Sequence, residues 1–183
     1  TEQLEEMRAR AIDLFEACST YLEVIRESFG DDDPDIRASY DSARAEIARM
    51  LQPVRFAVKA VTQLAGLITT HMEGVVKRLA RLRQIMVDRS RLPLTQFLDA
   101  TSDLRPDEAW LARVIASAGP AAARLEKNRP LILSVLDELA QDERTAMLSI
   151  NEQRALARKV SDAQQHLSDS KAVMIRANLR LVI

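Results

Sequence analysis

Apolar residues recur at alternating intervals of three and four along one stretch of the chain, and this period fixes the kind of element it can form. The series is Val54, Val58, Val61, Ala65, Ile68, Met72, Val75, Leu79, Leu82 and Met86. The intervals match the 3.6 residues of a helical turn and exclude a strand, whose side chains repeat every two residues. We therefore expect one helix from Gln52-Pro53 to Arg89, roughly 55 Å long at 1.5 Å per residue.

An apolar stripe of this length has to be covered, and two arrangements can cover it. The first two helices of the same chain can pack on it as an antiparallel bundle. Alternatively, it can pair with a second chain as a coiled coil; we favour the bundle. Gly66 and Gly74 lie inside the helix, and each costs about 1 kcal/mol relative to Ala. Such glycines either let a neighbouring helix approach closely or bend the rod.

Turn signals divide the rest of the N-terminal half into further helices. We expect an amphipathic helix from the N-terminus to about Ser28. A second helix follows, opened by Asp33 as N-cap and by Pro34. Its inward residues are expected to be Ile36, Tyr40, Ala43, Ile47 and Met50.

The C-terminal half contains similar signals. We expect a short helix over 94–98, another from Pro106 to Gly119-Pro120, and one over 121–140 that Pro130 kinks or splits. Ser149 and Glu152 form a capping box, and Ser161 with Gln164 repeats it before the last helix. No stretch alternates with a period of two, so the fold class is all-α. We expect an antiparallel helical bundle with one long central helix and several shorter helices.

Composition places the chain among soluble globular proteins. The 183 residues suffice for a domain with its own core, and 47% of them are hydrophobic. The lone cysteine, Cys18, excludes an internal disulfide and sits on an apolar stripe, as a small core residue would. No signal-peptide pattern and no apolar run of ~20 residues occur, so we expect a cytoplasmic protein without a membrane partner.

Signals of chemistry are absent. The sequence has no glycine-rich phosphate loop and no nucleophile elbow, and His71 and His166 stand far from any Cys or second His. The acidic run over 31–35 lacks the central Gly and terminal Glu of a calcium loop, so we interpret it as a helix-capping turn. We therefore expect no enzyme activity, cofactor, metal or small-molecule substrate.

Basic residues gather near the end of the long helix. Residues 51–100 carry 8 basic and 3 acidic side chains, although the whole chain has a net charge of −1. The cluster comprises Lys77, Arg78, Arg81, Arg83, Arg89 and Arg91. It is either a surface that contacts DNA phosphates or the solvated face of a helix, favoured near the negative end of the helix dipole. No aromatic residues interleave with it, so base stacking is not supported.

The last fourteen residues, SKAVMIRANLRLVI (170–183), resemble the opening helix of the second conserved region of bacterial primary sigma factors, the sigma-70 family. Three other stretches resemble the large helical insert that precedes this region: RLRQIMVDRSRLPLTQFL (81–98), Trp110 and SINEQR (149–154). The resemblance implies an insert over 1–160 and the first helix of region two over 161–183. Arg176 departs from it, because the family usually has an acid there, and so does Pro130.

For function, the resemblance implies a sigma factor that binds core RNA polymerase and directs promoter recognition and transcription initiation, with the insert as a spacer or contact surface. Leu179 and Val182 match positions that dock on the clamp helices of the β′ subunit. Asn178 and Arg180 match positions close to promoter DNA. The plain alternative for the aliphatic residues is a place in the core.

The competing interpretation of the whole chain is a helical scaffold or homodimerising coiled-coil protein without a polymerase role. The long apolar stripe is what motivates it. The chain also lacks a capping signal at Ile183 and begins with Thr1, so we expect it to be a segment of a longer protein.

Overall fold

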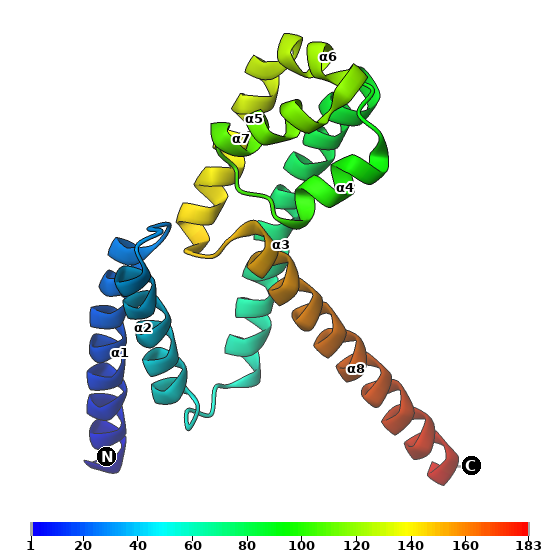
Figure 1. The fold of residues 1–183 in the computed structure, drawn as a ribbon. Coiled ribbons are helices and arrows are strands. Elements are labelled where there is room, and N and C mark those ends of the chain that lie inside the picture. Colours follow the sequence, from blue (N-terminus) through cyan, green and yellow to red (C-terminus); the bar gives the residue numbers. More distant parts are fainter. Residues whose placement is uncertain (1, 183) are drawn as a thin grey trace. The chain divides into compact units, whose positions relative to one another are not determined.

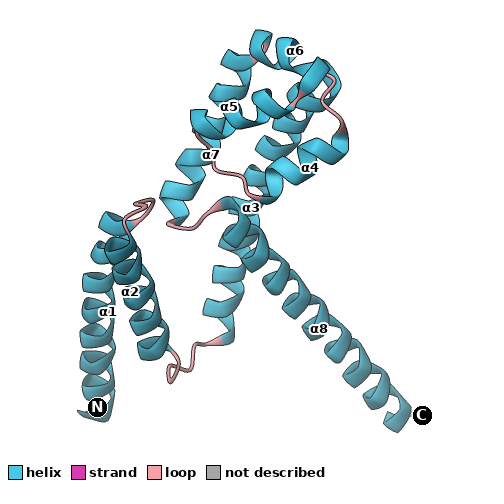
Figure 2. Cartoon of the chain, viewed as in Figure 1, coloured by secondary structure: helices cyan, strands magenta, loops and turns pink. Residues whose placement is uncertain are grey.

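The computed structural model describes the backbone of residues 2–182 and the side chains of residues 5–178. Within that range every regular element is a helix (Figure 2), which confirms the predicted all-α class. No helix in the described range is both long and apolar enough to span a bilayer. The chain divides into two compact units, residues 1–60 and 61–183.

Unit 1 is a hairpin of two helices, α1 (Glu2–Ser28) and α2 (Pro34–Leu51), which lie side by side in Figure 1. Asp33 caps α2 as predicted, because its Oδ1 accepts hydrogen bonds from the N–H groups of Asp35 at 2.9 Å and Ile36 at 3.4 Å. Those two donors would otherwise lack partners in the first turn of the helix.

The interface of the hairpin is small and partly aromatic. Cys18, Tyr40 and Ala43 are buried in it, as predicted. The Tyr40 ring lies 6.1 Å from the ring of Phe29, and the Arg44 guanidinium lies 5.2 Å from its centroid. Stacking of this kind adds roughly 0.5–1 kcal/mol at exposed sites. Ile36, which we predicted to point inward, is exposed.

The long helix is shorter at its start than predicted. It comprises α3 (Val58–Arg83) and a continuing π-helical turn, η1 (Gln84–Arg89). Residues 52–57 are not helical. Pro53 closes α2 instead of opening α3, since its ring removes the N–H that would continue a helix.

Unit 2 is built around the second half of the α3 stripe, from Met72 to Met86. The helices that follow α3 bury it: α4 (Leu94–Ser102), α5 (Glu108–Ser117), α6 (Ala122–Lys127) and α7 (Arg129–Ala146). The core residues that they and their connections contribute are Leu92, Phe97, Leu104, Trp110, Leu111, Val114, Leu125, Ile132, Val135, Leu136 and Leu139. We predicted that the first two helices would cover the stripe, and for this half the prediction was wrong.

Several helix boundaries differ from the predicted ones. The short helix runs on to Ser102 rather than stopping at 98, and Asp107, not Pro106, forms the N-cap of α5. Asp107 serves as the cap because its carboxylate accepts the backbone N–H of Trp110. Pro130 splits the next helix as predicted, with Asn128 between α6 and α7.

The last helix, α8 (Ile150–Val182), is one uninterrupted element. The Ser149–Glu152 capping box opens it as predicted, with the Ser149 N–H donating to Glu152 Oε2 at 3.0 Å. A second start at Ser161 was wrong. No Gly or Pro lies near Ser161 to stop the helix, so this residue is simply inside it.

The end of the long helix is an unusual turn. The N–H of Ser90 reaches the carbonyl of Ile85, and that of Leu92 reaches Met86, both at 3.0 Å. The fully buried Ser90 hydroxyl accepts a hydrogen bond at 3.1 Å from Asn128 Nδ2, which joins this turn to the start of α7. Arg91, which follows, adopts φ 63°, a left-handed conformation that normally favours glycine.

Replacing Arg91 by glycine should stabilise the protein. Its side chain is exposed, so Arg91→Gly gives up no core packing and relieves about 1 kcal/mol of left-handed strain. Urea unfolding followed by circular dichroism measures the change. Arg91→Ala is the control, because alanine keeps the Cβ that causes the strain and should not gain stability. Equal stabilities of the two variants would contradict the prediction.

Candidate functional site

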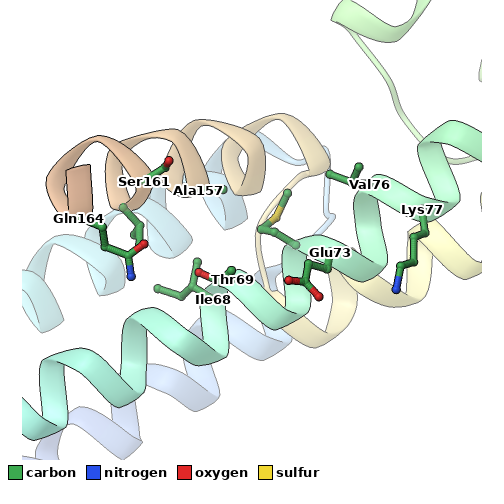
Figure 3. A pocket seen from close by; sticks show the side chains of 10 residues that line it. Ile68, Thr69, Glu73, Val76, Lys77, Ala157, Ser161 and Gln164 are labelled. Atoms are coloured by element: carbon green, nitrogen blue, oxygen red, sulfur yellow. The ribbon is translucent and has the colours of Figure 1, made fainter. Parts of the chain in front are cut away.

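An open groove of about 420 Å³ lies between α3 and α8 within unit 2. Figure 3 shows its two walls, with Ile68 and Thr69 on α3 and Gln164 on α8 between the two helices. Its apolar lining is Ile68, Met72, Val76, Ala157 and Val160, and its polar lining is Thr69, Glu73, Lys77, Ser161 and Gln164. This lining suits an apolar side chain or a helix face. It brings together no pair of groups that would act as acid and base.

A buried amide holds the two walls together where the groove begins. Gln153, on α8, is only 3% exposed, and its Oε1 lies 2.8 Å from Nε2 of His71 on α3. Its amide nitrogen donates to the carbonyl oxygens of Leu148 at 2.7 Å and Asp142 at 3.3 Å. Since that nitrogen is the donor in both bonds, His71 Nε2 carries the proton in the third. Gln153 thus joins α3, α7 and α8.

Two members of the predicted phosphate surface are ion-paired within the fold. Arg78 Nη1 lies 3.2 Å from Asp142 Oδ2, and Arg81 Nη1 lies 2.9 Å from Glu138 Oε1, both carboxylates belonging to α7. Arg78 Nε also lies 3.4 Å from Glu138. The Asp142 side chain is only 12% exposed, so its charge needs this partner. These two arginines therefore hold α3 against α7.

The other four predicted basic residues differ in position. Lys77 lies on the edge of the apolar groove. Arg83, Arg89 and Arg91 are exposed, and among the residues that the structure describes none of them has an ion pair. Sequence spacing gathered all six on one helix, but the fold divides them between structural pairs and free charges.

The residues singled out by the sigma-factor resemblance lie at the far end of α8. Asn178 is exposed. The side chains of Leu179, Arg180 and Val182 lie outside the described residues, although the helical backbone runs through them. Their predicted roles therefore stay predictions.

The preceding part of α8 carries large apolar side chains that no other element covers. Leu167, Val173, Met174 and Ile175 are all more than half exposed. Apolar side chains on a projecting helix are the usual anchors of helix-in-groove recognition. This part of α8 and the groove both have the apolar character that suits a macromolecular partner.

A half-buried carboxylate supports the start of α8. Glu143 Oε1 accepts the backbone N–H of the buried Ile150 at 2.7 Å. Burial, and to a smaller extent the neighbouring charges of Glu152 and Asp107, raise the pKa of Glu143, while the bond from Ile150 opposes the rise. Sequence reasoning missed Glu143 and Gln153, because nothing in the local pattern marks them.

No cluster of three or more Cys, His, Asp or Glu side chains suited to a metal ion occurs in the described residues. His166, the second histidine, lies on an exposed stretch of α8.

Comparison with known proteins shows the family of the chain. Residues 1–143 match the family described as the non-essential region of sigma-70. The chain is 28% identical over 144 residues to the RNA polymerase sigma factor RpoD of Neisseria gonorrhoeae. That alignment covers 79% of this chain and 22% of the relative, so the chain spans about a fifth of the relative's length.

The two glycines of α3 should respond differently to alanine. A Cβ at Gly66 would meet nothing within 4 Å, so Gly66→Ala should stabilise the helix by about 0.5–1 kcal/mol. A Cβ at Gly74 would lie 2.8 Å from Arg78 Nη1 and push that guanidinium away from Asp142. Gly74→Ala should therefore gain less, or lose stability, in urea unfolding. Equal gains would show that the ion pair does not depend on Gly74.

Glu143 should make stability depend on pH. Because its folded pKa is raised, the folded state binds the proton more tightly, and the free energy of unfolding falls as pH rises from the ordinary glutamate range through the raised pKa. Glu143→Gln keeps an acceptor for Ile150 and removes the charge. Its stability relative to the parent should grow as pH rises from the ordinary glutamate range through the raised pKa of Glu143. Glu73→Gln, at an exposed position, is the control for the loss of one carboxylate.

Proposed function

This chain belongs to the sigma-70 family through its non-essential region, and we propose that it works as the part of a primary sigma factor that connects this region to a helix docking on core RNA polymerase. The role is binding rather than catalysis, in the bacterial cytoplasm where polymerase and promoter DNA are found. The helices of unit 2 that precede α8 act as a spacer and contact surface beside the docking helix.

The observation that carries the proposal is the face of α8 on which the exposed Ile175 lies. Val173 is exposed too, but it lies about 160° around the helix and is not part of that face. Ile175 is 59% exposed, and in the sequence Leu179 and Val182 follow it at intervals of four and three, the spacing of one helix face. Anchors with this spacing are typical of a helix that lies in an apolar groove of a partner. The partner in this proposal is the β′ clamp of core RNA polymerase.

The same helix would approach promoter DNA. In the resemblance to sigma factors, Asn178 and Arg180 occupy positions close to the −10 element. Both residues are next to Leu179 in the sequence, so docking on polymerase and approach to DNA would use adjacent residues of one helix. Asn178 is exposed, as this role requires.

A homodimeric scaffold has less support. Its motive was the long apolar stripe of α3, but Met72, Val75, Leu82 and Met86 of that stripe are already buried within unit 2. A coiled coil with a second chain through these residues would have to open the core. Such an opening would cost several kcal/mol for each large side chain withdrawn from its packing.

Acidic substitutions in the docking stripe should weaken binding to core RNA polymerase. Leu179→Asp and Val182→Asp place a charge among apolar contacts, and each should reduce affinity about 10-fold or more. Biolayer interferometry with immobilised core enzyme and the 183-residue chain measures the dissociation constants. Circular dichroism checks that each variant keeps its helix content.

Val173→Asp is the matched control. Val173 is 62% exposed on the same helix but about 160° around the axis from Ile175. We expect it to change affinity by less than about 2-fold. Failure of the parent chain to bind core enzyme, or an equal loss with Val173→Asp, would overturn the proposal.

A further inference from the structure

Two turns that are far apart in the sequence meet at one end of unit 2. The hydrogen bond from Asn128 Nδ2 to the buried Ser90 hydroxyl joins the turn after η1 to the junction of α6 and α7. Asn128 is fixed on its own side too, because Nδ2 also donates to the carbonyl of Arg124 at 3.0 Å. The two turns therefore lie next to each other.

Each turn carries two exposed cations. Arg89 and Arg91 flank Ser90, while Arg124 and Lys127 lie one helical turn and one residue before Asn128. None of these four, which we name the basic tip, has an ion pair among the described residues. The Glu126 carboxylate beside them is engaged by Arg129, whose other nitrogen binds Glu108 at 2.7 Å. Within η1 itself, the acidic residue is Asp88.

The backbone at Arg91 indicates that its side chain has a use. Glycine would adopt φ 63° without strain, yet the chain has an exposed arginine there. No core contact offsets that strain, because the side chain points to solvent rather than into the fold. Strained residues of this kind are found preferentially at sites that bind a ligand.

We propose that the basic tip binds the phosphodiester backbone of duplex DNA. Guanidinium groups match phosphate oxygens in a bidentate fashion, and three of the four residues are arginines. The inference deepens the proposed function, on which it rests for the presence of promoter DNA. It adds Arg124 and Lys127, which sequence spacing did not connect to the cluster, and leaves out the ion-paired Arg78 and Arg81.

Duplex DNA suits this surface better than single strands. Single-strand binders stack bases on exposed aromatic side chains. The two aromatic residues of unit 2, Phe97 and Trp110, are both buried, and the Trp110 indole donates to the carbonyl of Ala100. Contacts to phosphates alone carry no sequence information, so binding should be strong at low salt and indifferent to sequence.

The test is fluorescence anisotropy of a labelled duplex with the 183-residue chain, over salt concentrations from about 50 to 200 mM, without polymerase. The quadruple variant Arg89→Gln, Arg91→Gln, Arg124→Gln and Lys127→Gln should lose affinity at least about 10-fold. The slope of log affinity against log salt should fall by about 3 to 4, close to 0.9 for each phosphate contact removed. Because polymerase is absent, this result is separate from the docking experiment.

A matched control removes four exposed positive charges from unit 1: Arg8→Gln, Arg37→Gln, Arg55→Gln and Lys59→Gln. It lowers the net charge equally and should leave the slope nearly unchanged. Arg91→Gly alone should unfold at a higher urea concentration yet bind DNA more weakly, which a purely structural role does not predict. The proposal would be overturned if the parent chain did not bind DNA, or if the control variant lost as much affinity as the quadruple variant. It would also be overturned if the parent chain bound poly-glutamate as tightly as DNA, because the basic tip would then be a site for acidic proteins.

Discussion

Burial of the α3 stripe between Met72 and Met86 is the constraint around which unit 2 is arranged. Leu82 and Met86 have no exposed surface, and each such side chain contributes roughly 1.5–3 kcal/mol when removed from water. The chain achieves this burial by breaking into short helices at Pro93, Gly119-Pro120 and Pro130, each break letting it fold back over the same rod. Once the stripe is covered, the remaining polar groups have to find partners at the edges of that core.

Those polar partners account for the joints of the unit. Gln153 fastens the start of α8 to α3 and α7, Asn128 fastens the α6–α7 junction to the end of the long helix, and Arg78 with Asp142 fastens α3 to α7. Each of these side chains is half-buried or more. A polar atom left without a partner in such a place lowers the free energy of unfolding by about 1–3 kcal/mol. The joints therefore specify one arrangement of helices whose apolar faces alone would tolerate several.

What the sequence could predict follows from the range of the interactions involved. Asp33, Pro130 and the Ser149–Glu152 box act within a single turn, so their spacing was enough to place helix ends. The partners of Ser90, Arg81 and His71 lie 38, 57 and 82 residues away, and no local period connects them. For the same reason the basic cluster looked uniform in the sequence, although the fold turns two of its arginines into structural pairs. The family match covers residues 1–143, whereas the most specific resemblance lies in 170–183, so each supports a different part of the assignment.

Because α8 is one unbroken helix, its C-terminal end and the helices packed at its start move together. Its projecting part, from Val160 to Val182, is roughly 35 Å long and contains no glycine or proline at which to bend. Gln153 lies roughly 44 Å from Val182, so a tilt of about 5° at the Gln153 joint would swing the far end by about 4 Å, more than the length of a hydrogen bond. A partner that binds the C-terminal end of α8 would fix the orientation of the whole of unit 2. A displacement of unit 2 would likewise be transmitted along α8 to that binding site.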